Sequence, residues 1–168
     1  MTHSRPPRRT HRTSLAPMRL ARNAATLLTP PELAKTLAPL RAATQALREG
    51  VATELEWSIV ASSIYVAQAI EQQGVVRGLG EHFRSAEVAL HGIEQRAMAS
   101  GEWKATALYY QELDHINTAV DLHEFQLMRL SYSEVSRAVN KATGEIRSTS
   151  GRIITLAAQQ ADMLREAS

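Results

Sequence analysis

Apolar residues recur at intervals of three and four along most of the chain, which predicts amphipathic α-helices rather than strands. Capping residues and glycines divide this pattern into successive helices. The predicted helices cover about residues 30–48, 53–73, 79–97, 102–130 and 131–143. A C-terminal segment at 144–168 follows, and a short terminal helix is expected there after the Ser- and Gly-containing stretch 148–151. The pattern therefore predicts an all-α protein, an antiparallel bundle of four to five helices.

Three of the predicted helices begin with a capping box, in which a hydroxyl residue is followed three positions later by Glu. The boxes are Thr29 to Glu32, Thr53 to Glu56 and Ser131 to Glu134. Residues 53–73 carry two apolar strips, so we expect this helix to pack on two neighbours at the centre of the core.

The apolar residues of the segment 79–97 repeat at steps of 4, 3, 4, 3 and 4, which is a heptad seam. They are Leu79, Phe83, Ala86, Leu90, Ile93 and Ala97. The seam is shorter than the three or four heptads of a coiled coil, and this favours packing inside the bundle.

The predicted helix at 102–130 has a second apolar strip beside its inner stripe. This strip contains Trp103, Tyr110, Phe125 and Met128, mixed with Asp114, Asn117 and Asp121. Aromatic residues and Met are enriched at protein interfaces, so one interpretation is a protein-binding surface. In the other interpretation, the helix at 30–48 or the C-terminal segment covers the strip.

Length and composition predict one domain with a tail, because the chain has 168 residues and 44% of them are hydrophobic. The chain contains no Cys. Without Cys there is no disulfide or thiolate metal site, which fits a cytoplasmic setting. No apolar run reaches the roughly 18 residues of a membrane span, and no signal peptide is recognisable. We therefore expect a soluble protein without a membrane partner.

The net charge of +2 hides a strong segregation along the chain. Residues 1–31 contain six Arg and no acidic residue, whereas residues 49–124 carry a net charge of −8. Because salt screens each field beyond about 10 Å, the two regions can serve different partners. The acidic region supplies four further candidates for protein binding, namely Glu87, Glu94, Glu112 and Asp114.

Residues 1–28 are rich in Arg, Pro, Ser and Thr, and predict a disordered basic arm ahead of the bundle at 29–143. Its candidate contacts to nucleic-acid phosphates are Arg5, Arg8, Arg9 and Arg12. A solubilising tail and a mitochondrial presequence are the alternatives, the latter because residues 18–28 can form a short amphipathic helix.

Residues 133–152 match part of a helix-turn-helix, with Val135, Val139 and Ile146 at buried positions and Asn140 at the turn. Its candidate DNA-binding residues are Arg137, Lys141, Arg147 and Arg152. Against this match, Lys141 occupies a position that is usually apolar.

The chain has no nucleophile elbow, phosphate-binding loop or zinc-protease motif, so we assign no catalytic residue, metal or cofactor and expect no enzyme. Glu112 and His115 form one Glu-x-x-His pair, whereas di-metal bundles use two. We interpret this pair, together with Glu87, His91 and Glu94, as parts of solvated faces. His123 lies on the inner stripe of its helix and is interpreted as a core histidine, and His82 is interpreted in the same way.

Five segments together resemble small all-helical proteins of unknown function from phage- and plasmid-like regions of proteobacterial genomes. They are Arg5–Arg9, Leu28–Leu33, the region of Trp57, Ser100–Thr106 and Val120–Leu127. Some of those proteins are labelled as transcription regulators. The resemblance implies a mobile-element origin and transfers no catalytic or binding residue.

These observations lead to two main hypotheses, and a metal-binding bundle enzyme is a third option. In the first, the chain is a non-enzymatic interaction protein that binds a host protein or nucleoprotein, and an inhibitor of host defence such as an anti-CRISPR is one specific form. In the second, it is a DNA-binding transcription regulator that uses residues 133–152 and the basic arm.

Overall fold

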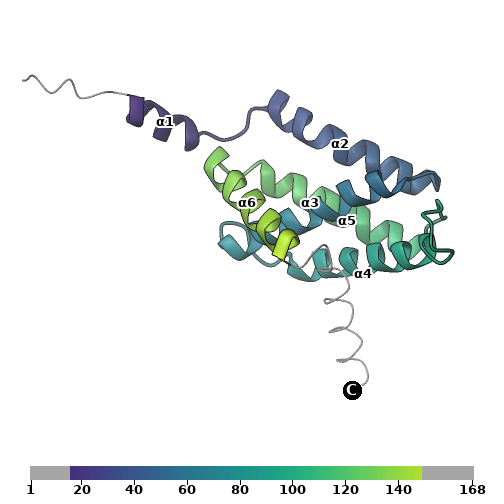
Figure 1. The fold of residues 1–168 in the computed structure, drawn as a ribbon. Helices are drawn as coiled ribbons and strands as arrows, with labels where there is room; N and C mark the ends of the chain where they lie inside the picture. Colours follow the sequence, from purple (N-terminus) through teal and green to yellow (C-terminus); the bar gives the residue numbers. More distant parts are fainter. Residues whose placement is uncertain (1–15, 149–168) are drawn as a thin grey trace, which may run out of the picture.

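The computed structural model describes residues 16–148, and all of its regular elements are helices (Figure 1). Arg5, Arg8, Arg9, Arg12, Arg152 and the predicted terminal helix lie outside the described residues. None of the helices in the described part is long and apolar enough to cross a membrane. The six described helices are α1 (Ala16–Ala24), α2 (Pro30–Glu49), α3 (Glu54–Gln73), α4 (Gly80–Ala97), α5 (Tyr110–Leu127) and α6 (Tyr132–Ser148).

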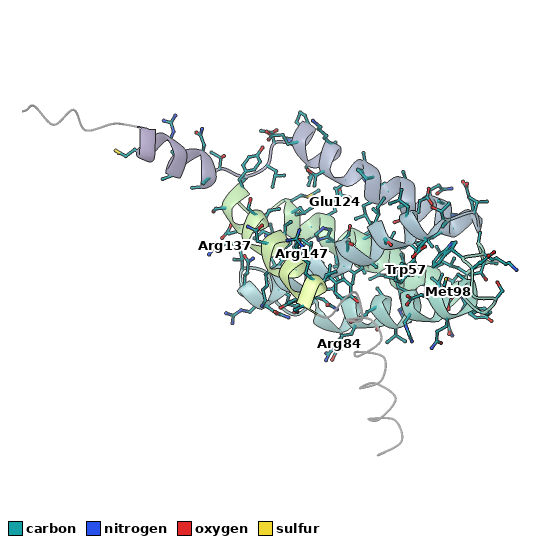
Figure 2. The ribbon with its side chains drawn as sticks, in the orientation of Figure 1. Trp57, Arg84, Met98, Glu124, Arg137 and Arg147 are labelled. Carbon is teal, nitrogen blue, oxygen red and sulfur yellow. The ribbon has the colours of Figure 1, made fainter. Side chains whose placement is uncertain are left out.

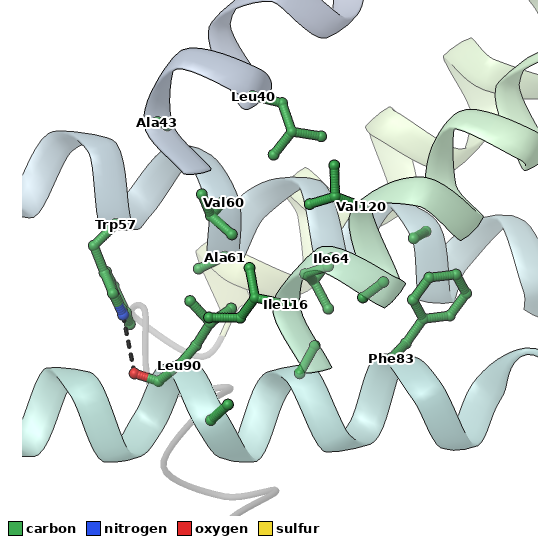
Figure 3. Close-up of a cluster of buried hydrophobic side chains, with 14 of the residues drawn as sticks. Leu40, Ala43, Trp57, Val60, Ala61, Ile64, Phe83, Leu90, Ile116 and Val120 are labelled. Atoms are coloured by element: carbon green, nitrogen blue, oxygen red, sulfur yellow. Dashed lines mark hydrogen bonds between the residues drawn. The ribbon is translucent and has the colours of Figure 1, made fainter. Parts of the chain in front are cut away.

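Helices α2 to α5 run alternately up and down the bundle, and α6 packs beside them (Figure 1). Helix α3 contacts α2, α4, α5 and α6, which confirms its predicted central place. Its two apolar strips explain this arrangement, because one strip alone would cover only one neighbour. Leu40 from α2, Val60 and Ile64 from α3, Leu90 from α4 and Ile116 from α5 meet in the core (Figure 3).

The predicted capping boxes are present in the structure. The backbone N–H of Thr29 donates to Glu32 Oε2 at 2.9 Å, and the N–H of Thr53 donates to Glu56 Oε2 at 2.7 Å. At the start of α6, the N–H of Ser131 donates to Glu134 Oε2 at 2.8 Å. Local chemistry thus sets these three helix starts, because each box satisfies donors that have no partner inside the helix.

The predicted helix at 102–130 is too long at its beginning, since α5 starts at Tyr110. Residues 98–109 instead form a connection across the end of the bundle. Trp103 packs there against Trp57, with ring centroids 5.9 Å apart, and its indole N–H donates to the Ala52 carbonyl at 2.9 Å. This contact joins residues about fifty positions apart, and the burial of two indoles outweighs the local helical pattern.

Helix α6 continues to Ser148, so the prediction that Gly144 ends it was wrong. Gly144 lies on the exposed side, where a missing side chain leaves no gap in the packing. The predicted turn at Asn140 is also absent, because α6 runs through it without a break. The buried residues of α6 are Ala138 and Ala142, whereas Val139, expected inside, is 41% exposed.

Residues 16–24 of the predicted arm form the short helix α1. The segment after α1 is attached to the bundle by one bridge between Leu27 and Ser131, in which the N–H of Tyr132 donates to the Thr26 carbonyl at 3.1 Å. The start of α6 therefore holds the entry to α2 in place.

Candidate interaction surfaces

One line of six side chains follows the outer side of α5 from end to end. Its members are Tyr110, Asp114, Asn117, Asp121, Phe125 and Met128. Their steps of 4, 3, 4, 4 and 3 residues place them on one side of the helix. The buried residues of α5, such as Ile116, Val120 and Leu127, occupy the opposite side. We call these six residues the α5 stripe.

The α5 stripe is apolar at its ends and acidic between them. Tyr110 is 82% exposed, Phe125 40% and Met128 51%. Asp114 and Asp121 are exposed, and neither takes part in an ion pair or hydrogen bond within the described residues. The covered-strip interpretation is therefore wrong for α2, because Tyr110, Phe125 and Met128 remain exposed beside it.

Trp103 is not part of this surface. It lies in the connection before α5, where it is partly buried against Trp57. Its indole completes the end of the core, which separates Trp103 from the exposed line on α5, and its predicted protein-binding role stays a prediction.

The other predicted acidic contacts do not form one surface with the stripe. Glu112 forms a bidentate ion pair with Arg96, with N–O distances of 2.7 and 2.6 Å, and accepts the backbone N–H of Tyr109 at 2.8 Å. Glu112 thus joins α4 to the start of α5 and is committed to the fold. Glu94 is half-buried on α4, and its Oε2 lies 3.5 Å from Nδ1 of His91.

Glu87 contradicts the prediction of a solvated face on α4, because only 7% of the residue is exposed. Its Oε2 accepts a hydrogen bond from Gln68 Nε2 at 3.0 Å. Burial raises the pKa of the Glu87 carboxyl, against the opposing effects of the Gln68 hydrogen bond and of nearby His91. Glu87 therefore faces α3, at the edge of a pocket of about 450 Å³ between α3, α4 and α6.

The predicted basic residues of α6 lie on its outer face. Arg137 and Arg147 are exposed there (Figure 2). Lys141 is exposed too, but its ammonium group donates to Gln72 Oε1 on α3 and lies 3.9 Å from Glu145 Oε1. The outer face of α6 thus presents two guanidinium groups on an unbroken helix, not the two helices of a helix-turn-helix.

The histidines of α4 and α5 differ in how far they are buried. His123 is 5% exposed, which confirms its core position, whereas His82 is exposed and was wrongly interpreted as a core residue. His115 is exposed beside Glu112. Across residues 16–148, no three or more His, Asp or Glu side chains are placed to hold a metal ion.

Sequence reasoning missed Tyr65 and Gln68, the α3 residues that face Glu87 across the pocket. They belong to neither apolar strip of α3 that marked its core contacts. The only local signal was their spacing of three, which places both on one side of the helix.

Comparison of the chain with protein-family models, with curated proteins and with solved structures finds no match.

Proposed function

We propose that this protein is a non-enzymatic interaction protein, and that its α5 stripe binds a basic helical segment of a partner protein. The observation that carries the proposal is the combination of exposed apolar side chains at the ends of the stripe with two carboxylates between them that have no ion-pair or hydrogen-bond partner among residues 16–148.

The chemistry of the stripe defines the partner. Asp114 and Asp121 are seven residues apart, or about 10 Å along the helix axis at 1.5 Å per residue. A partner helix with Lys or Arg at the same spacing could pair with both carboxylates. Apolar side chains beside its basic residues would cover Tyr110 at one end and Phe125 with Met128 at the other.

The energetics assign separate roles to these groups. Burial of the exposed aromatic and Met side chains supplies most of the binding free energy, since such residues are the usual anchors of interfaces. The Asp residues, at exposed sites, mainly raise the association rate and select basic partners. Arg129, whose guanidinium lies 4.2 Å from the Phe125 ring centroid, holds that ring in position at the end of the stripe.

The partner is proposed to be a host protein or nucleoprotein, and the protein to originate from a mobile element. The resemblance to proteins of phage- and plasmid-like regions supports this origin. Inhibition of a host nucleic-acid-binding protein, as by an anti-CRISPR, is one form the interaction could take, because a basic helix is a common means of contacting nucleic acid.

The test compares two tagged variants with the wild type in affinity purification from nuclease-treated host lysate. Asp114→Lys combined with Asp121→Lys reverses the charge of the stripe. Glu81→Lys combined with Glu102→Lys is the matched control, since both residues are exposed acids outside the stripe and the change in net charge is the same.

We expect one host protein to co-purify with the wild type and with the control variant, but not with the Asp114→Lys, Asp121→Lys variant. Tyr110→Ala with Phe125→Ala should lose the same protein at unchanged net charge. Equal recovery of every protein by the wild type and both stripe variants would refute the proposal.

A second candidate function is DNA binding through the outer face of α6, which the exposed Arg137 and Arg147 favour. Since α6 runs unbroken through the described part of the predicted helix-turn-helix, up to Ser148, it would contact phosphates along one face instead of inserting a separate recognition helix. Binding of duplex DNA should then fall steeply with salt and weaken for Arg137→Ala with Arg147→Ala. DNA binding that these substitutions leave unchanged would exclude α6 as the contact.

A further inference from the structure

A small pocket lies between α2, α3, α5 and α6, apart from the α5 stripe. Its volume is about 200 Å³. An apolar cavity of about 150 Å³ can hold benzene, whereas drug-sized ligands need about 300 Å³ or more. The pocket therefore has room for one substituted ring or for two small fused rings. Because His123 lines it, we call it the His123 pocket.

The walls of the His123 pocket are largely apolar and carry no charge. Aliphatic side chains from all four helices supply most of them, namely Leu37, Leu40, Val66, Leu127, Val135 and Val139. None of the Asp, Glu, Lys or Arg residues within 16–148 lines this pocket. A charged ligand would lose hydration there without gaining a counter-ion. The lining thus favours an uncharged and mostly apolar ligand.

His123 brings one well-oriented polar group to these walls, although only 5% of the residue is exposed. The Gln126 amide is fixed because its Nε2 donates to the Ala67 carbonyl at 3.1 Å. The amide oxygen of Gln126 therefore faces Nδ1 of His123, at 3.4 Å. An oxygen at this place favours the ring form with the proton on Nδ1, which leaves Nε2 as a hydrogen-bond acceptor.

Nε2 of His123 is available to a ligand. It has no hydrogen-bond partner among residues 16–148, and it is not one of the fully enclosed polar atoms of this part of the chain. Its accessible surface lies in the pocket that His123 lines. Two hydroxyls of the lining use their own protons within their helices: Thr36 donates to the Glu32 carbonyl and Ser63 to the Ile59 carbonyl, both at 2.9 Å. The inner wall therefore offers an acceptor and calls for a donor.

We propose that the His123 pocket binds a small, uncharged ring compound that carries one N–H or O–H group and donates it to Nε2 of His123. The ring covers the aliphatic side chains of the four helices, and this burial of apolar surface supplies most of the affinity. The hydrogen bond to Nε2 selects the ligand, because a molecule without a donor would displace water from the imidazole and leave the acceptor unpaired.

The first test compares indole with indene on the full chain by isothermal titration calorimetry. The two molecules have nearly the same size and shape, but indene has a CH2 group where indole has its N–H. We expect saturable binding of indole that is about three- to tenfold tighter than that of indene, the effect of one neutral hydrogen bond. In NMR spectra of the wild type, the resonance of the His123 Nε2 nitrogen should move with indole and much less with indene.

The second test removes the acceptor. His123→Leu keeps the wall apolar, so both compounds should still bind, but their affinities should become nearly equal. The comparison is made within each protein, so a general change of pocket shape in the variant affects both compounds alike.

The third test closes the pocket at its mouth, where Val139 is 41% exposed. Val139→Trp places a large side chain over this opening and should weaken indole binding at least tenfold. Val88→Trp is the matched control, because Val88 is 43% exposed on α4 and lies outside the His123 pocket. This control should bind indole as the wild type does.

Three results would each overturn the proposal: no saturable binding of indole, equal affinities of indole and indene for the wild type, or indole binding that Val139→Trp leaves unchanged. None of the residues that line the His123 pocket belongs to the α5 stripe, so this test and the partner-binding test can fail independently.

Discussion

The buried His123 should make the stability of the protein depend on pH in a defined window. Its side chain lies among Leu37, Leu40 and Leu127, and burial lowers its pKa from 6.5 to about 4. Gln126 opposes this shift: its Nε2 donates to the Ala67 carbonyl at 3.1 Å, so its Oε1 faces Nδ1 of His123 at 3.4 Å as an acceptor, which raises the pKa of His123 by less than burial lowers it. Protonation would place a positive charge on this buried ring, which costs free energy in the folded state.

The sign follows from proton binding. Between about pH 6.5 and pH 4 the unfolded chain binds a proton at His123 that the folded protein does not. The contribution of His123 to the free energy of unfolding is therefore fully present above this window and is lost as the pH decreases through it. A pKa difference of about 2.5 units, at about 1.4 kcal/mol per unit, corresponds to a loss of about 3 kcal/mol by pH 4.

The assay is urea unfolding of the wild type and of His123→Leu at a series of pH values. Leu fills a similar volume but cannot titrate, so the difference between the two stabilities isolates the effect of His123 from that of the carboxyl groups. Between neutral pH and about pH 4, we expect the free energy of unfolding of the wild type to fall by about 3 kcal/mol more than that of His123→Leu. Parallel profiles for His123→Leu and the wild type would refute the reasoning.

Two further predictions concern contacts between helices. Trp57→Phe removes the indole N–H that donates to the Leu90 carbonyl at 3.0 Å (Figure 3), and should lower the free energy of unfolding by about 1–2 kcal/mol. Urea denaturation measures this loss, and a cost below about 0.5 kcal/mol would mean that the bond adds little. Glu112→Gln replaces a bidentate ion pair with a weaker contact and leaves the half-buried Arg96 charge uncompensated, so we expect a loss of about 1–3 kcal/mol. High salt should reduce the difference from the wild type only partly, and complete loss of the difference in salt would indicate a solvated pair.

Much of the α5 stripe was predictable because its members are spaced by the helical repeat. Tyr110, Asp114, Phe125 and Met128 fall on one side of any helix through these residues, whatever the helix packs against. The capping boxes were predictable for a similar reason, since Thr53 and Glu56 satisfy each other within one turn. Fold class and helix order follow from such short-range rules.

The short-range rules could not predict the roles of Trp103, Glu87 and Gly144. Each role depends on contacts with a segment distant in sequence, or on which side of the helix remains exposed. Trp103 leaves the helical pattern to cover Trp57, and Glu87 is buried where α4 packs against α3, with Gln68 of α3 donating a hydrogen bond to it. Gly144 remains helical because its side of α6 faces away from α3. Local spacing specifies which residues share a side of a helix. Which side becomes buried, and whether a carboxylate there meets solvent, an arginine or a pocket, depends on how the helices pack against one another.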